Sequence, residues 1–141
     1  MTYPLIQSIG IVAFDGDRVL LVRQGKASKH FDGICGLPAG KIDEGETAIQ
    51  AAAREFREET GLVCSIDDLQ QLPKTYRATI EQKDGIKIFD WHVFLCKKYS
   101  GKLIATDETA PFWVTVKELN SMQLLPNVQD AVREALIVLN P

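Results

Sequence analysis

The sequence predicts an α/β protein of the α+β kind, in which one domain combines a β-sheet with two helices. Apolar and β-branched runs are separated by short turn signals such as Asp15-Gly16, a pattern typical of hairpin-connected strands. Two stretches, 48–60 and 128–139, carry apolar residues at helical spacing. The chain has 141 residues, of which 45% are hydrophobic, so a single domain spanning residues 1–141 can bury a sizeable core.

The strands are expected on both sides of the first helix. Residues 5–14 and 17–23 form a hairpin around Asp15-Gly16, and a polar loop at 24–36 follows. A second hairpin turns at Lys83-Asp84-Gly85, and its long return strand is expected to be central because both of its faces are largely apolar. The strands expected after the first helix are 63–66, 72–81, 86–97 and 112–116, with a short helical turn at 117–122.

Capping signals set the ends of the helix at 48–60. Thr47 and Gln50 have the spacing of a capping box, and Gly61 suits the left-handed residue that ends a helix. One side of this helix can pack on a core through Ile49, Ala52, Ala53 and Phe56. Asn127 is expected to cap the helix at 128–139, which covers the sheet and carries no chemistry of its own.

Glu55, Glu58 and Glu59 fall together on another side of the first helix. Like charges at these spacings destabilise a helix by roughly 0.2–0.5 kcal/mol per pair, and anions near its C-terminal end are disfavoured by the helix dipole. The cluster therefore suggests a site for a hard cation, since Mg²⁺ and Mn²⁺ prefer oxygen ligands. The alternative from the residues alone is a solvated acidic surface.

Composition restricts the classes of partner. The net charge of −3 does not favour binding to nucleic acid or to an anionic membrane. The three cysteines have no CxxC spacing, so reduced thiols in a cytoplasmic protein are expected. The N-terminal segment shows neither a signal peptide nor a transmembrane span.

The stretch from Gly40 to Leu62 resembles the signature of the Nudix hydrolases. Gly40 is followed after five residues by Glu46 and after seven more by Arg54-Glu55-Phe56-Arg57-Glu58-Glu59-Thr60-Gly61-Leu62, which matches every fixed position of the Nudix box. The resemblance implies a mixed β-sheet sandwiched between helices. It also implies metal-dependent hydrolysis of a diphosphate linkage in a nucleoside diphosphate-linked compound, by attack of water at phosphorus. Mg²⁺ is the implied cofactor, and Mn²⁺ is a possible substitute.

The resemblance also assigns roles to single residues. Glu55, Glu58 and Glu59 match the metal-binding glutamates, and the Ala39 carbonyl matches a backbone ligand presented by a tight turn at Gly40. Arg54 matches the arginine that orients the glutamates. Glu46 is expected to be a structural or water-mediated partner more than a direct ligand. Glu108 is expected to be a further ligand or the general base, with a solvated turn residue as the alternative.

Substrate contacts are expected outside the box. Arg23 is expected to point toward the phosphates, Lys29 lies in a loop that either touches the substrate or is solvated, and Tyr76 either stacks on a base or packs in the core. His30 is a weak candidate for the base, and His92 is expected to be a packed, hydrogen-bonded residue. Ala78 occupies the position that often marks substrate subfamilies, so an NTP, a modified nucleotide and a nucleotide sugar all stay open. The resemblance allows a homodimer, and a nucleotide-sensing module without hydrolysis is the alternative function.

Overall fold

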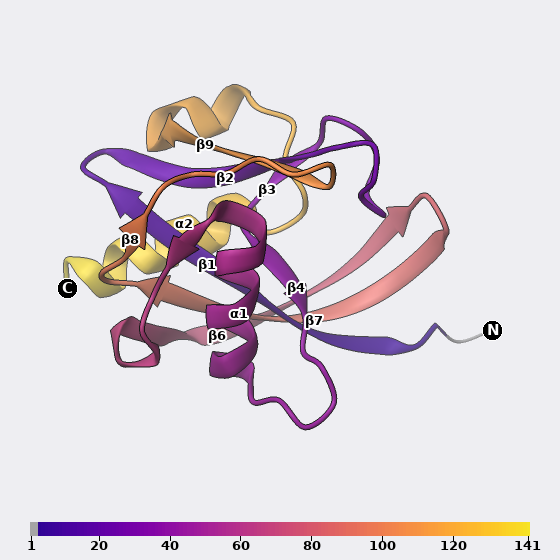
Figure 1. Ribbon diagram of the computed structural model, residues 1–141, viewed down its shortest axis with the longest axis horizontal. Helices are drawn as coiled ribbons and strands as arrows, with labels where there is room; N and C mark the ends of the chain where they lie inside the picture. The colour runs from indigo at the N-terminus through magenta and orange to yellow at the C-terminus, as the bar shows by residue number, and fades with distance from the viewer. Residues whose placement is uncertain (1–2) are drawn as a thin grey trace.

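A mixed sheet built around β1 (Leu5–Asp15) and β7 (Gly85–Cys96) forms the frame of the protein (Figure 1). The computed structural model describes residues 3–141. β1 and β7 run parallel, and the order of hydrogen-bonded strands is β3-β2-β1-β7-β6, with β4 on β1 and β9 on β2. A separate small sheet joins β5 to β8. The other strands are β2 (Arg18–Gln24), β3 (Cys35–Gly36), β4 (Ala39–Lys41), β5 (Leu62–Val63), β6 (Leu69–Gln82), β8 (Ser100–Gly101) and β9 (Thr109–Thr115).

Both predicted hairpins are confirmed, and one predicted strand is wrong. β1 and β2 turn at Gly16, and β6 and β7 turn before Gly85, which also has a positive φ. The strand expected at 63–66 ends at Val63, and Ile66–Asp68 forms a 3₁₀ turn (η1) instead. This turn forms because the Ser65 hydroxyl accepts a hydrogen bond from the Asp67 amide at 3.3 Å, which offers the backbone an alternative to the sheet.

Helices α1 (Ala48–Thr60) and α2 (Val128–Leu139) cover opposite faces of the sheet (Figure 1). Side-chain alternation along β7 supplies both cores, because Val93 and Leu95 face α2 while Phe94 faces α1. The central position predicted for this strand is confirmed. The α1 side contains fully buried Phe56, and the α2 side contains fully buried Ala131 and Ala135.

The start of α2 differs from the sequence prediction. Asn127 has a left-handed backbone with φ 70°, and its side chain makes no capping hydrogen bond. The predicted cap is therefore wrong, because this backbone conformation differs from the extended one through which an N-cap side chain reaches the helix amides. The predicted turn at 117–122 is confirmed as the 3₁₀ helix η2 (Val116–Ser121). Among the described residues, no helix has the length and hydropathy that crossing a bilayer would require.

Candidate active site

The predicted ends of α1 are confirmed by its capping geometry. The Thr47 hydroxyl accepts from the Gln50 amide at 3.3 Å, and the Gln50 side chain accepts from the Thr47 amide at 3.0 Å. Gly61 has φ 83° and donates its amide to the Arg57 carbonyl. These contacts fix the first and last residues of the helix. Packing of its apolar side on the sheet then turns its acidic side toward β4.

Arg54 holds three glutamates and the loop before the helix in one network. Its Nε and Nη2 donate to the two oxygens of Glu46 at 2.7 and 2.9 Å. Its Nη1 donates to Glu55 Oε1 at 2.8 Å and to Glu58 Oε2 at 3.2 Å. The Lys41 carbonyl accepts a further bond from Nη2 at 3.1 Å. The arginine thus has the positions needed to orient Glu55 and Glu58, the role that the resemblance implied.

Glu46 has the environment of a structural partner. Its bidentate contact with Arg54 lowers its pKa to about 2, and a hydrogen bond from the Asp43 amide at 2.9 Å acts in the same direction. Both carboxylate oxygens are occupied by Arg54. The loop between β4 and α1 is therefore closed by an ion pair.

Glu59 points away from this network, toward β4. Its Oε1 accepts a hydrogen bond from the Ala39 amide at 2.6 Å. Burial raises the pKa of Glu59 to about 8, and the charges of Glu55, Glu108 and Glu58 act in the same direction, while the Ala39 hydrogen bond opposes them. The Thr109 hydroxyl donates to the Glu59 carbonyl at 3.1 Å, which fastens the start of β9 beside the end of α1. This link brings exposed Glu108 to the same region as Glu59.

Gly40 is needed for a reason that the sequence did not reveal. The tight turn expected there is wrong, because Gly40 lies in β4 and pairs with Ile9 of β1. A Cβ atom at Gly40 would lie 2.2 Å from the Glu55 carboxyl carbon, so the missing side chain makes room for Glu55. Burial raises the pKa of Glu55, and the Arg54 guanidinium opposes that shift.

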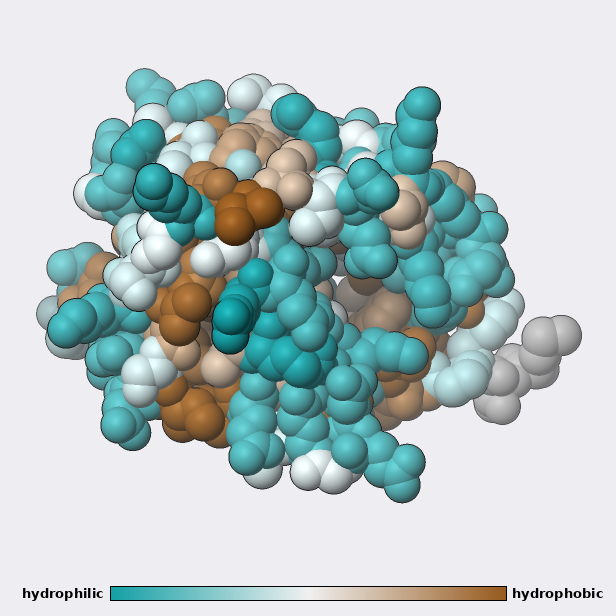
Figure 2. Space-filling model, viewed as in Figure 1, coloured by the Kyte–Doolittle hydropathy of each residue, from teal (hydrophilic) through white to brown (hydrophobic). Residues whose placement is uncertain are grey.

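A cavity of about 440 Å³ opens beside these carboxylates. Figure 2 shows a hollow next to α1 with hydrophobic side chains on its floor and hydrophilic side chains around its rim. Glu55, Glu59 and Glu108 lie at one part of its lining, and Leu37, Phe89, Trp91 and Leu125 supply apolar wall. The volume falls within the range of ligand pockets and suits a nucleoside with its phosphates.

The loop between β2 and β3 is fixed at both ends and along its length. On one side, the Gly25 amide donates to the Glu108 carbonyl at 2.7 Å and the Ala27 amide to the Asp107 carbonyl at 3.2 Å. On the other side, the Lys83 amide donates to the Lys29 carbonyl at 2.8 Å, and Lys83 Nζ contacts Asp32 at 2.6 Å. The loop therefore bridges the turn before β9 and the β6–β7 hairpin, and residues 27–30 line the cavity.

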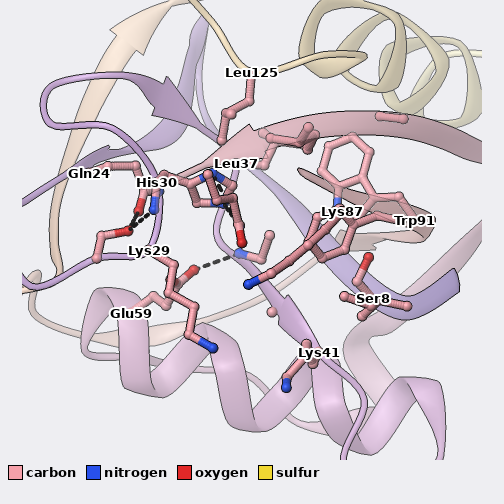
Figure 3. Close-up of a pocket in the computed structure, with 18 of the residues that line it drawn as sticks. Ser8, Gln24, Lys29, His30, Leu37, Lys41, Glu59, Lys87, Trp91 and Leu125 are labelled. Carbon is pink, nitrogen blue, oxygen red and sulfur yellow. Dashed lines mark hydrogen bonds between the residues drawn. The ribbon is translucent and has the colours of Figure 1, made fainter. Parts of the chain in front are cut away.

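Three lysines approach the cavity from different elements. Figure 3 shows the amino ends of Lys29, Lys41 and Lys87 on the α1 side, with Trp91 and Leu125 across from them. Lys29 was expected in this role from its loop. Lys41 and Lys87 were not, although strand alternation places Lys87 on the same face of β7 as Phe89 and Trp91.

Arg23 and Tyr76 lie outside the cavity lining. Arg23 is exposed on the face of β2 opposite Gln24, and its guanidinium lies 5.1 Å from the centre of the Phe112 ring. Tyr76 packs edge-to-face on Trp91 and donates its hydroxyl to Glu134 at 2.9 Å. Each side chain therefore has a structural partner within the fold. His92 has the hydrogen-bonded environment that was predicted for it, with Nε2 at 2.7 Å from Gln7 Oε1.

The carboxylates suit a hard divalent ion through their chemistry. Within residues 3–141, no three His, Cys, Asp or Glu side chains already converge as a metal site. Arg54 occupies one oxygen of Glu55 and one of Glu58, which leaves each carboxylate a second oxygen. The raised pKa of Glu59 reflects its burial and the negative charges of Glu55, Glu108 and Glu58 nearby, and a bound cation with oxygen ligands would lower that pKa again.

Comparison with known proteins decides the family. The family model described as the NUDIX domain matches residues 4–136. The chain belongs to the Nudix family. The mixed sheet between helices that the Nudix box implied is also confirmed, because the crystal structure of the MutT protein from Methanosarcina mazei Go1 superposes with a TM-score of 0.80. That match is 21% identical in sequence and covers 100% of this chain and 99% of the other.

Curated relatives of this Nudix protein are similar over part of their length. The oxidized purine nucleoside triphosphate hydrolase of Danio rerio is 32% identical over 85 residues, which cover 60% of this chain and 51% of that protein. The 8-oxo-dGTP diphosphatase of Haemophilus influenzae is 32% identical over 90 residues, which cover 64% of this chain and 61% of that protein. The chain therefore spans about half of the length of the Danio rerio protein, at 51%. It spans 30% of the length of another relative, the putative nudix hydrolase 1 of Caenorhabditis elegans.

Proposed function

We propose that this Nudix protein hydrolyses a diphosphate linkage in a nucleoside polyphosphate, with a purine nucleoside triphosphate, intact or oxidised, as the first candidate. The observation that carries this proposal is one cavity with carboxylates at one part of its lining and an apolar, aromatic wall at another. The lysines between them supply positive charge for the phosphates. The names of the two relatives support a purine triphosphate over the other nucleotides.

The proposed roles follow the positions of the side chains. Glu55, Glu58, Glu59 and the Ala39 carbonyl would hold Mg²⁺, or Mn²⁺ in its place. The bound ion would neutralise phosphate charge and lower the pKa of a bound water. Arg54 keeps Glu55 and Glu58 oriented through single-oxygen contacts. Lys29, Lys41 and Lys87 hold the polyphosphate against this side of the cavity.

Glu108 is the proposed acceptor for the proton of the attacking water. It lines the cavity, lies close enough to Glu59 to influence its pKa, and is exposed. Within residues 3–141 its carboxylate makes no hydrogen bond, whereas Glu46, Glu55 and Glu58 are engaged by Arg54. A carboxylate free of such contacts can turn toward a water held at the neighbouring glutamates.

The test is product identification with a panel of NTPs, oxidised dGTP, ADP-ribose, nucleotide sugars and dinucleoside polyphosphates, with and without Mg²⁺ or Mn²⁺. Release of a nucleoside monophosphate and pyrophosphate from a purine triphosphate, dependent on the metal, is the expected result. Glu108→Gln should lower kcat with little change in KM, whereas Glu118→Gln, in η2 outside the cavity, should leave both unchanged. Binding of nucleotides without any turnover would support the sensing module instead.

A further inference from the structure

The β6–β7 hairpin presents a buried amide to the cavity with one end unused. Gln82, the last residue of β6, is 7% exposed and lines the cavity. Its carbonyl oxygen, Oε1, is the one buried side-chain N or O atom within residues 3–141 that lacks a hydrogen-bond partner. An unpaired buried acceptor disfavours the folded state, so a ligand that supplies a donor to it would remove that penalty.

The other end of the same amide is held by His30. Gln82 Nε2 lies 3.2 Å from His30 Nε2 and 3.4 Å from His30 Nδ1, and the His30 backbone amide is in turn held by the Ser28 hydroxyl at 3.1 Å. Burial lowers the pKa of His30, and the positive charge of Lys87 acts in the same direction. A neutral ring can receive the Gln82 N–H against its nitrogens, whereas a doubly protonated ring has only donors there, and this contact directs the carbonyl oxygen away from His30.

The neighbours of Gln82 on the same face are apolar except for Lys87, which pairs with Ile80 across the hairpin. Strand alternation places Ala78 and Ile80 beside it on β6, and Phe89 and Trp91 follow on β7, all lining the cavity. A flat ring can lie on this wall, and an amino group projecting from the ring can then reach an acceptor at its end. Adenine and guanine each carry one exocyclic amino group with two N–H donors.

We propose that Gln82 is a specificity-determining residue whose carbonyl oxygen accepts a hydrogen bond from the exocyclic amino group of a bound purine. The inference rests on the proposed function in assuming that the ligand is a purine nucleotide. It adds that the cavity selects amino-bearing purines over the same rings without the amino group. A site built around a hydrogen bond rejects an analogue that leaves its buried partner unpaired.

The experiment uses nucleoside monophosphates, which have no diphosphate bond, so binding is measured independently of hydrolysis. Calorimetric titrations compare GMP with IMP and AMP with purine riboside monophosphate, since each pair differs by the amino group alone. In the unmodified protein, at least one pair should show about 10- to 100-fold tighter binding of the amino-bearing member. In Gln82→Met, similar in size but without the acceptor, that ratio should fall to about one.

Gln24 supplies a matched control, because it is similarly buried, at 6% exposed, and also lines the cavity. Unlike that of Gln82, its Oε1 has a partner, since it accepts a hydrogen bond from the Ser28 hydroxyl. Gln24→Met should therefore keep the preference for the amino group. If the Gln82→Met protein no longer unfolds cooperatively on heating, Gln82→Leu is used in its place. Equal binding within both pairs, a preference that survives the loss of Gln82, or no binding of any of the four monophosphates would overturn the proposal. A protein that shows the preference but hydrolyses no triphosphate would refute the proposed function and leave the role of Gln82 standing.

Discussion

Replacing Glu59 by glutamine should stabilise the metal-free protein near neutral pH while removing its proposed activity. In the folded state, burial and the neighbouring carboxylates raise the pKa of Glu59 from an ordinary 4.5 to about 8. The charged form is thus disfavoured by folding. Glutamine carries no charge, and its carbonyl can keep the hydrogen bond that Glu59 accepts from the Ala39 amide.

The size of the effect follows from the same shift. At pH 7 the carboxyl is ionised in the unfolded chain and largely protonated in the folded protein. The cost of folding at this pH is set by the distance from the unfolded pKa of 4.5 to pH 7, roughly 2.5 units. At about 1.4 kcal/mol per unit, the carboxyl lowers the free energy of unfolding by on the order of 3 kcal/mol. Glu59→Gln should recover much of this, which corresponds to a rise in Tm of roughly 5–10 °C for a domain of this size.

The pH dependence has a defined sign. A carboxyl whose folded pKa is raised contributes no penalty below its unfolded pKa, because both states are then protonated. The penalty appears as the pH rises through 4.5 and is complete above about 8. The gain in Tm of Glu59→Gln over the unmodified protein should therefore be near zero at pH 4 and largest at pH 8.

Differential scanning calorimetry in EDTA at pH 4, 7 and 8 measures this gain directly. Glu58→Gln is the matched control, because the Glu58 side chain is 56% exposed and its replacement should leave Tm within about 2 °C of the starting value. Both variants should lose most turnover. A Glu59→Gln protein that is less stable at pH 7, or a gain in Tm that does not shrink toward pH 4, would refute the reasoning.

Four further predictions concern two glycines, the cap of α1 and the metal. Gly40→Ala should lower kcat/KM at least tenfold with little loss of stability, because its Cβ would displace only the flexible end of Glu55. Gly10→Ala should instead destabilise the fold by about 1–3 kcal/mol in urea titrations, because its Cβ would lie 2.4 Å from the buried Trp91 ring; equal stability of the two variants would contradict this contrast. Thr47→Ala should reduce stability by about 1 kcal/mol while Thr47→Ser does not, as measured by chemical denaturation, since the hydroxyl caps α1. Millimolar Mg²⁺ should raise Tm in proportion to the logarithm of its concentration above Kd, and an unchanged Tm would argue against a metal held in the folded state.

The sequence was most informative where the signals are local. The capping box at Thr47, the left-handed Gly61 and the hairpin turns depend on neighbouring residues alone, and all are present in the structure. The grouping of three glutamates on α1 also followed from helical periodicity. The roles of these glutamates at a metal remain predictions.

Features that depend on distant contacts were missed. The reason for Gly40 is its contact with a side chain fifteen positions along the chain, and nothing in its own neighbourhood signals it. The contact of Arg23 with the Phe112 ring depends on the register of β2 with β9 and was not predicted, while its role at the phosphates stays a prediction. Gln82 became a candidate only once its burial and its unpaired oxygen were known.

The parallel pairing of β1 with β7 has a consequence for folding during synthesis. Its ladder joins Leu5 to Ile88 and Ala13 to Cys96, so β1 gains this neighbour only after most of the chain has left the ribosome. Until then the apolar side of α1, including Phe56, lacks Phe94 as a packing partner. A polypeptide that stops after the Nudix box would expose this surface to aggregation and chaperone binding. Folding should be slow for a domain of this length, since contacts distant in sequence must form before α1 is covered.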